Sequence, residues 1–200
     1  MIKNIITTLA VMAFLFAGCT NPFSTRTPEA PSGDTSIDRN LQTDPNQVLT
    51  KIQQAFQQKD TQAYQDCFAD STLTGSSFAF TPEQNESYRL NNWEITDERN
   101  YFFNLVNAEE LQTVDIQYPG SPAIPTPVTS SPDTLEIDFN YLITAEFRTK
   151  TEMYQGRSIL RILKSPEELW YIYEWLDLRN SSDISDSTWS TLKANYRISG

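Results

Sequence analysis

The stretch that decides the fold is TLEIDFNYLITAEF, residues 134–147, in which apolar and polar side chains alternate almost without a break. A period of two residues is typical of a β-strand with one face on a hydrophobic core. The apolar set comprises Leu135, Ile137, Phe139, Tyr141, Ile143, Ala145 and Phe147, and the alternate set comprises Glu136, Asp138, Asn140, Leu142, Thr144 and Glu146. The sequence therefore predicts a long strand beside a packed core.

The segment after this strand predicts its antiparallel partner. A two-residue turn at Lys150 and Thr151 places Tyr141 opposite Leu160, so that apolar side chains meet apolar ones, whereas a slip by one residue mixes the two faces. In this register Arg161 lies diagonal to Asp138, and Arg157 lies diagonal to Glu146. These pairs favour a solvated ion-pair face over an anion site.

A third strand is expected in ELWYIYEWLDLR, residues 168–179, and it is apolar on both faces. Trp170 and Ile172 fall on one face, while Tyr171, Tyr173 and Trp175 fall on the other. Such a strand needs cover on both sides. Helices supply one cover, and a ligand, a partner subunit or the end of the chain supplies the other.

The end of the chain, SDSTWSTLKANYR, predicts a helix with Ser187 as its cap and with Trp189 and Leu192 facing inward. Two amphipathic helices open the domain, the first starting at Asp44 and Pro45 and the second capped by Asp60. Between these ends the sequence predicts a strand at 76–80, a helix at 96–108, a strand at 111–118 and a proline-rich loop at 119–133.

This order of elements resembles the nuclear-transport-factor-like superfamily, also called ketosteroid-isomerase-like or SnoaL-like. The local likenesses are VLTKIQQAFQQKDTQAYQDCFAD, which is similar to its opening helix pair, and ELWYIYEWLDLR, which is similar to its last long strand. The resemblance implies an α+β fold in which N-terminal helices pack on a strongly curved antiparallel sheet. The result is a cone-shaped, cystatin-like roll with a pocket at its open end. It implies little about function, because this fold hosts enzymes, binding modules and dimerisation domains.

Composition excludes several function classes. The 200-residue chain has a formal net charge of -11, which repels phosphate backbones, so no nucleic-acid partner is expected. It contains no histidine, which excludes Ser-His-Asp, Cys-His and His-metal mechanisms. No metal site, cofactor or catalytic residue is predicted, since Tyr64, Tyr141 and Asp138 cannot be matched to an isomerase site.

The N-terminus, MIKNIITTLAVMAFLFAGC, predicts a secretory signal with Lys3 before a short apolar run. Ala17 and Gly18 before Cys19 resemble the lipobox of bacterial lipoproteins, although Phe16 replaces the usual leucine. The resemblance implies a lipid anchor on Cys19, which leaves Cys67 without a disulfide partner. Thr20 is not the aspartate of inner-membrane retention, so outer-membrane residence facing the periplasm is expected.

Three parts of the chain follow from these patterns: a lipoprotein signal peptide at 1–18, a flexible tether at 19–44 and a single α+β domain at 45–200. Two roles remain for the most prominent aromatic residues of the domain: contact with a ligand and filling of the core. These residues are Trp93, Tyr141, Tyr154, Trp170 and Trp175.

The predicted function is that of a lipid-anchored cell-envelope protein that acts as a non-enzymatic binding or scaffolding module. Two alternatives remain open: a small-molecule enzyme of isomerase or dehydratase type that uses the cone pocket, and a pure dimerisation module. The partners left open are the membrane, a homodimer through the sheet, a small apolar ligand and another envelope protein.

Overall fold

The computed structural model describes residues 39–120, 123–128, 131–180 and 187–197, all within one unit that spans residues 35–200. The predicted signal peptide at 1–18, the lipidated Cys19 and most of the tether lie outside the described residues. Among the residues described, no helix has the length and apolar character needed to cross a membrane.

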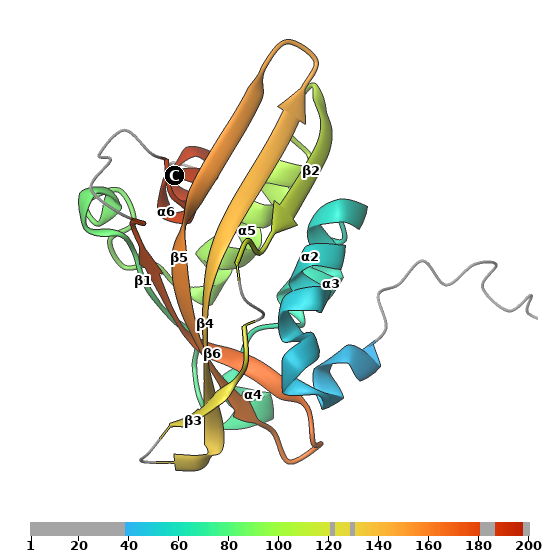
Figure 1. Ribbon diagram of the computed structural model, residues 1–200, viewed down its shortest axis with the longest axis vertical. Helices are drawn as coiled ribbons and strands as arrows, with labels where there is room; N and C mark the ends of the chain where they lie inside the picture. Colours follow the sequence, from blue (N-terminus) through green and yellow to red (C-terminus); the bar gives the residue numbers. More distant parts are fainter. Residues whose placement is uncertain (1–38, 121–122, 129–130, 181–186, 198–200) are drawn as a thin grey trace, which may run out of the picture. The chain divides into compact units, whose positions relative to one another are not determined.

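The domain is built on one strongly curved, six-stranded sheet in the order β1-β6-β5-β4-β2, with β3 paired to β4 (Figure 1). All neighbouring strands are antiparallel except β1 and β6. The strands are β1 (Ala79–Thr81), β2 (Leu111–Gln117), β3 (Thr126–Val128), β4 (Ser131–Phe147), β5 (Thr151–Lys164) and β6 (Trp170–Leu178). The predicted α+β class with a curved antiparallel sheet is confirmed.

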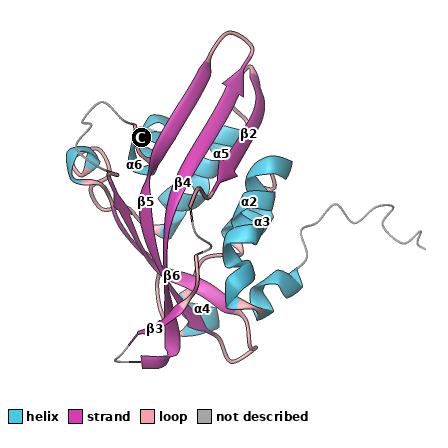
Figure 2. Ribbon diagram, in the orientation of Figure 1, coloured by secondary structure: helices cyan, strands magenta, loops and turns pink. Residues whose placement is uncertain are grey.

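Helices cover the inner face of this sheet (Figure 2). Helix α2 packs on β2, α6 packs on β5, and α5 contacts both α3 and α6. The helical elements are η1 (Arg39–Thr43), η2 (Pro45–Gln47), α2 (Val48–Gln58), α3 (Thr61–Gln65), α4 (Ser71–Thr74), η3 (Gln84–Glu86), α5 (Ile95–Val106) and α6 (Trp189–Tyr196).

Carboxylate caps fix where the first helices begin. The Asp44 side chain accepts from the Asn46 amide ahead of η2, and Asp60 accepts from the Gln62 and Ala63 amides at the start of α3. Asp70 caps α4 in the same way. The predicted opening helix pair, with its starts at Asp44 and Asp60, is therefore confirmed.

The first described residues are already packed. Gln42 of η1 is 1% exposed, and its amide donates to the backbone oxygens of Asp66 and Trp170 at 2.8 and 3.0 Å. The buried Lys51 ammonium donates to the Gln42 side chain at 2.5 Å. The sequence assigned residues 39–44 to the tether. Through Gln42, this segment is instead hydrogen-bonded to the folded domain.

The predicted register of the long hairpin is wrong. Phe147 N donates to Lys150 O at 2.8 Å, so the turn is formed by Arg148 and Thr149, two residues earlier than expected. Tyr141 consequently pairs with Gly156 rather than with Leu160. The shift is even, so every apolar side chain keeps its face. Gly156 is required here, because a Cβ atom would collide with the Tyr141 hydroxyl.

The prediction that β6 is apolar and covered on both faces is confirmed at its start, where Trp170, Tyr171 and Ile172 are all buried, but it is wrong beyond Ile172. Arg161 pairs with Glu174 while Ile162 pairs with Ile172, so β6 carries one extra residue, Tyr173. This β-bulge reverses the alternation, and Ile172 and Trp175 both reach the core with 0% exposure.

Three boundaries differ from the predicted ones. The expected loop at 119–133 contains β3 and the start of β4, because Pro127 lies on a short strand that pairs only with β4. The expected strand at 76–80 is reduced to Ala79–Thr81. The last helix is capped by Thr188 rather than Ser187, while Trp189 and Leu192 face inward as predicted.

Candidate functional site

The interior of the curved sheet is filled by the chain's own last helix. Trp189 of α6 is fully buried, with its ring 4.4 Å from that of Trp175 and 5.1 Å from that of Tyr141, centroid to centroid. Phe56 of α2 closes the same cluster at 5.7 Å. These contacts make α6 an integral part of the core.

The five aromatic candidates are all buried, at 9% exposure or less, but they do not form one site. Trp93, Tyr141 and Trp175 surround α6. Tyr154 lies toward the C-terminal end of α6, where its hydroxyl donates at 2.7 Å to the same Glu152 oxygen that accepts from Tyr196. Trp170 belongs to another contact, in which its carbonyl accepts from Gln42.

A buried ion pair lies at the centre of this interior. The Lys193 ammonium donates to Glu98 Oε2 at 2.8 Å, and both side chains are 0% exposed. Trp93 Nε1 donates to the same oxygen at 2.8 Å, and the Tyr64 hydroxyl donates to Glu98 Oε1 at 2.7 Å. Lys193 Nζ also lies 3.6 Å from the centroid of the Trp175 ring, a cation–π contact.

Burial shifts the proton affinities of this cluster. Desolvation lowers the pKa of Lys193 to about 8, against the opposing field of Glu98. Desolvation, reinforced by the Glu98 charge, raises the pKa of Tyr64 and of Tyr101 well above 10. The two tyrosine hydroxyls lie 2.7 Å apart, and Trp189 Nε1 donates to Tyr101 at 3.0 Å. Each charged or hydroxyl group of the cluster is therefore engaged by another.

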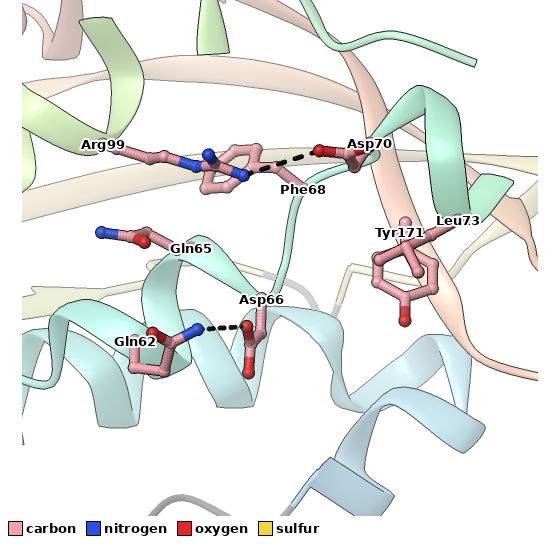
Figure 3. A pocket seen from close by; sticks show the side chains of 8 residues that line it. All are labelled: Gln62, Gln65, Asp66, Phe68, Asp70, Leu73, Arg99 and Tyr171. Atoms are coloured by element: carbon pink, nitrogen blue, oxygen red, sulfur yellow. Dashed lines mark hydrogen bonds and ion pairs between the residues drawn. The ribbon is translucent and has the colours of Figure 1, made fainter. Parts of the chain in front are cut away.

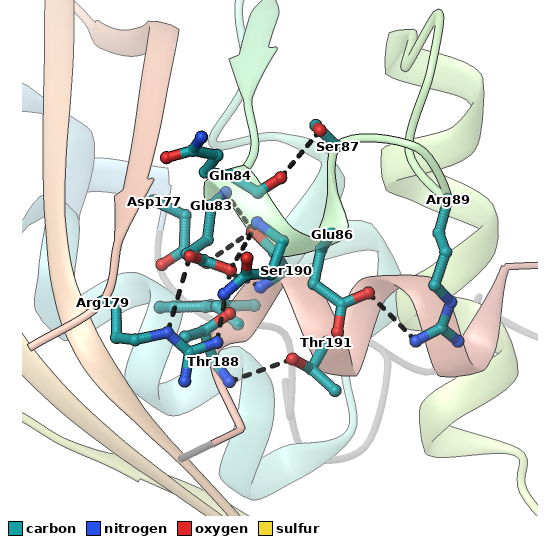
Figure 4. Close-up of polar contacts among 12 residues, drawn as sticks. Glu83, Gln84, Glu86, Ser87, Arg89, Asp177, Arg179, Thr188, Ser190 and Thr191 are labelled. Carbon is teal, nitrogen blue, oxygen red and sulfur yellow. Dashed lines mark hydrogen bonds and ion pairs between the residues drawn. The ribbon is translucent and has the colours of Figure 1, made fainter. Parts of the chain in front are cut away.

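A second polar network holds the N-terminus of α6 (Figure 4). Asp177 Oδ2 accepts from the Ser190 amide and hydroxyl at 2.7 and 2.6 Å, and Asp177 Oδ1 accepts from the Tyr141 hydroxyl at 2.7 Å. The Tyr141 hydroxyl in turn accepts from Trp189 N at 2.7 Å. Burial raises the pKa of Asp177, although its hydrogen bonds oppose that shift. Arg179 and Glu83, paired at 3.3 Å, lie beside this network.

The outer face of the sheet carries ion pairs, as predicted, but with different partners because of the register. Arg157 Nε donates to Asp138 at 2.7 Å. Arg161 lies opposite Glu136 and diagonal to Asp138, but it bonds Glu136 at 3.1 Å and Glu174 at 2.6 Å.

An open pocket of about 270 Å³ lies at the surface between α3, α4, α5 and β6 (Figure 3). Its lining combines an arginine, two carboxylates, two amides, a tyrosine and two apolar side chains. The residues are Gln62, Gln65, Asp66, Phe68, Asp70, Leu73, Arg99 and Tyr171. A neighbouring pocket of about 330 Å³ shares Asp70 and reaches Trp93 and Phe78. Within the described ranges, no group of three His, Cys, Asp or Glu side chains could hold a metal ion.

Sequence reasoning did not single out Glu98, Asp177, Arg99 or Lys193. Lys193 follows Trp189 by four residues and so shares its inward helical face, which is a readable signal. Glu98 likewise precedes Phe102 by four residues in α5. Arg99 carries no such signal, because its pocket is assembled from separate elements.

No protein-family model and no curated protein matches this sequence. Solved structures do match its fold. A nuclear transport factor 2 superfamily protein from Salmonella enterica subsp. enterica serovar Typhimurium str. LT2 shares 12% identity at a TM-score of 0.52, covering 74% of this chain and 97% of that chain. Naphthalene 1,2-dioxygenase, solved with indole bound in its active site, shares 10% sequence identity at a TM-score of 0.52. The match covers 74% of this chain and 83% of that chain.

A candidate aromatic ring hydroxylase from Novosphingobium aromaticivorans is similar at 9% identity, with a TM-score of 0.51 and 74% and 94% coverage. These likenesses show that the chain has the nuclear-transport-factor-like cone fold. The resemblance seen in the sequence is thereby confirmed for the fold.

Proposed function

We propose that this protein is a non-enzymatic binding module, held on the bacterial cell envelope by lipid on Cys19. Its cone domain faces the periplasm from the outer membrane. In this proposal residues 19–44 act largely as a spacer, which keeps an acidic domain clear of the headgroups. The lipid chains supply the membrane affinity that a surface with a net charge of -11 lacks.

The observation that carries the binding role is the occupation of the cone by α6. An isomerase-type enzyme needs a free general base beside an oxyanion donor in a pocket that admits substrate. The interior carboxylates, Glu98 and Asp177, are instead bound by Lys193, Tyr64, Trp93, Tyr141 and Ser190. This arrangement favours recognition at the surface of the domain over chemistry inside it.

The anchor is tested by metabolic labelling with an alkyne fatty acid of the full chain produced in a bacterial host. We expect label on the wild type and on Cys67→Ser, because Cys67 is buried and forms no disulfide within the described residues. Cys19→Ser should lose the label and accumulate as unprocessed precursor. Equal labelling of Cys19→Ser, or an unlabelled wild type, would exclude the anchor.

A further inference from the structure

The surface pocket at Arg99 contains recognition groups that the protein itself leaves unused. Arg99 Nε is buried and has no hydrogen-bond partner among the described residues. Its only described charge contact is Asp70, at 3.9 Å from Nη2, which is too long for a hydrogen bond. An arginine presents five donors in a planar fork that matches a carboxylate. The Nη donors of Arg99, on a side chain that is 39% exposed, therefore suit an anionic group.

A second unpartnered group belongs to the same pocket. Tyr171 of β6 is 3% exposed and lines the pocket, yet its hydroxyl forms no hydrogen bond within the described part of the chain. Unlike Arg99 Nε, this hydroxyl is not itself fully buried, so a molecule in the pocket can reach it. A polar ligand in the pocket would supply its hydrogen-bond partner.

The pocket also holds two carboxylates that suit a cation, one on each side. Figure 3 shows Arg99 and Asp70 along one side and Gln62 and Asp66 along the other. Asp66 Oδ1 accepts from Gln62 at 2.7 Å, which leaves Oδ2 available. Hydrogen bonds from Thr72 lower the pKa of Asp70, so its carboxylate is charged at neutral pH.

Apolar surface and size restrict the ligand further. Phe68 and the half-exposed Leu73 line the same pocket, so part of the ligand is apolar. Sites for drug-sized molecules occupy about 300–1,000 Å³. A volume of about 270 Å³ is suited to a smaller molecule.

We propose that this pocket binds a free α-amino acid with an aliphatic side chain, whose carboxylate contacts Arg99 and whose ammonium contacts Asp66 and Asp70. Phe68 and Leu73 contact the aliphatic side chain, and the Tyr171 hydroxyl completes the polar contacts. This inference rests on the proposed function, since it gives the binding module its ligand.

The test is isothermal titration calorimetry on the full chain in detergent, with L-leucine, N-acetyl-L-leucine and L-leucinamide as probes. The first carries both charges, the second only the carboxylate and the third only the ammonium. We expect L-leucine to bind at least tenfold more tightly than either derivative, because each lost charge leaves a protein charge unpaired. Equal binding of leucine and leucinamide, or no leucine binding at millimolar concentration, would overturn the proposal.

Matched variants locate the site. Arg99→Met should weaken leucine binding at least tenfold and leave leucinamide unchanged, whereas Arg148→Met, on an exposed side chain of the distant hairpin turn, should change neither. Asp66→Asn should weaken both ligands, and Tyr171→Phe should weaken leucine without altering the fold. Identical affinities for Arg99→Met and Arg148→Met would overturn the site. Fatty-acid labelling of Cys19 without leucine binding would remove this inference and leave the anchored module standing.

Discussion

Lys193 shows how a single charged residue is accommodated in a hydrophobic core. Removing an ammonium from water costs several kcal/mol, and a well-packed apolar residue of similar volume would avoid that cost. Here the cost is offset by the Glu98 carboxylate at 2.8 Å and by the Phe80 and Trp175 rings, whose centroids lie 3.5 and 3.6 Å from Nζ. The contribution of this buried pair to stability therefore depends on both Lys193 and Glu98 being present.

Substitution of Lys193 by alanine should lower the free energy of unfolding by about 3–5 kcal/mol, because it leaves a buried carboxylate without its cation. Replacing both partners, as Glu98→Gln with Lys193→Met, should recover part of that loss. Urea unfolding followed by tryptophan fluorescence measures both effects. The matched control is Lys164→Ala, which breaks an exposed pair with Glu168 and should cost at most about 1 kcal/mol. Equal losses for the two alanine variants would contradict this account.

The strands show which features of an element a sequence pattern can define. Alternation over residues 134–147 predicted the long strand and its buried face, because period two is a direct property of the pleat. It could not define the pairing register, since an even shift leaves every face unchanged. The bulge at Tyr173 was missed for a related reason. The extra residue has no partner on β5, and only comparison with that strand reveals it.

The sequence pattern predicted some residues of the candidate site and missed others. Trp189 and Leu192 were predicted to face inward because apolar residues recur at helical spacing. Lys193 lies beside them, but lysine is seldom fully buried without a partner, and that partner is 95 residues away. The Arg99 pocket depends on how four elements meet, which local periodicity does not encode.

Deleting Tyr173 tests the bulge at the scale of the element. Without the extra residue, Ile172 and Trp175 lie two positions apart, so a regular strand keeps both buried side chains on the core face and keeps the pairs Ile162–Ile172 and Arg161–Glu174. We therefore expect the deletion variant to remain native-like. Deleting Leu176, in a regular part of the same strand, should instead cost at least about 3 kcal/mol, because Trp175 and Asp177 become neighbours and one of these two buried side chains must turn outward. Near-ultraviolet circular dichroism and urea unfolding would report both, and equal losses for the two deletions would refute the role of Tyr173 as the extra residue.

At the scale of the whole molecule, α6 joins the two buried polar networks, one around Asp177 and the other around Glu98. Together they form the buried polar system of the domain. The N-terminus of α6 is held by Asp177 and Tyr141 from the sheet, and its Lys193 is held by Glu98 from α5. Trp189 connects the two ends through hydrogen bonds to Tyr141 and Tyr101. Loss of this helix would expose both carboxylates at once, so the polar system and the core should unfold together.

That coupling predicts an unusual response to alkaline pH. The folded pKa of Lys193 is about 8, below its ordinary value of 10.5, so between these limits the unfolded chain binds more protons and the free energy of unfolding rises with pH. The tyrosines act in the opposite sense. Burial raises the pKa of Tyr64, Tyr101, Tyr118 and Tyr141 well above 10, so above pH 10 the folded chain binds more protons and stability falls.

Several tyrosines outweigh one lysine, so stability should pass through a maximum near pH 10 and then fall steeply. Phenolate absorbance measured alongside near-ultraviolet circular dichroism checks this, because the buried tyrosines should ionise only as the native signal is lost. Lys193→Met should remove the rise between pH 8 and 10 and keep the later fall, since it eliminates the lysine and leaves the tyrosines buried. Full phenolate formation in a protein that still gives the native signal would show that these hydroxyls are open to solvent and would refute the closed interior.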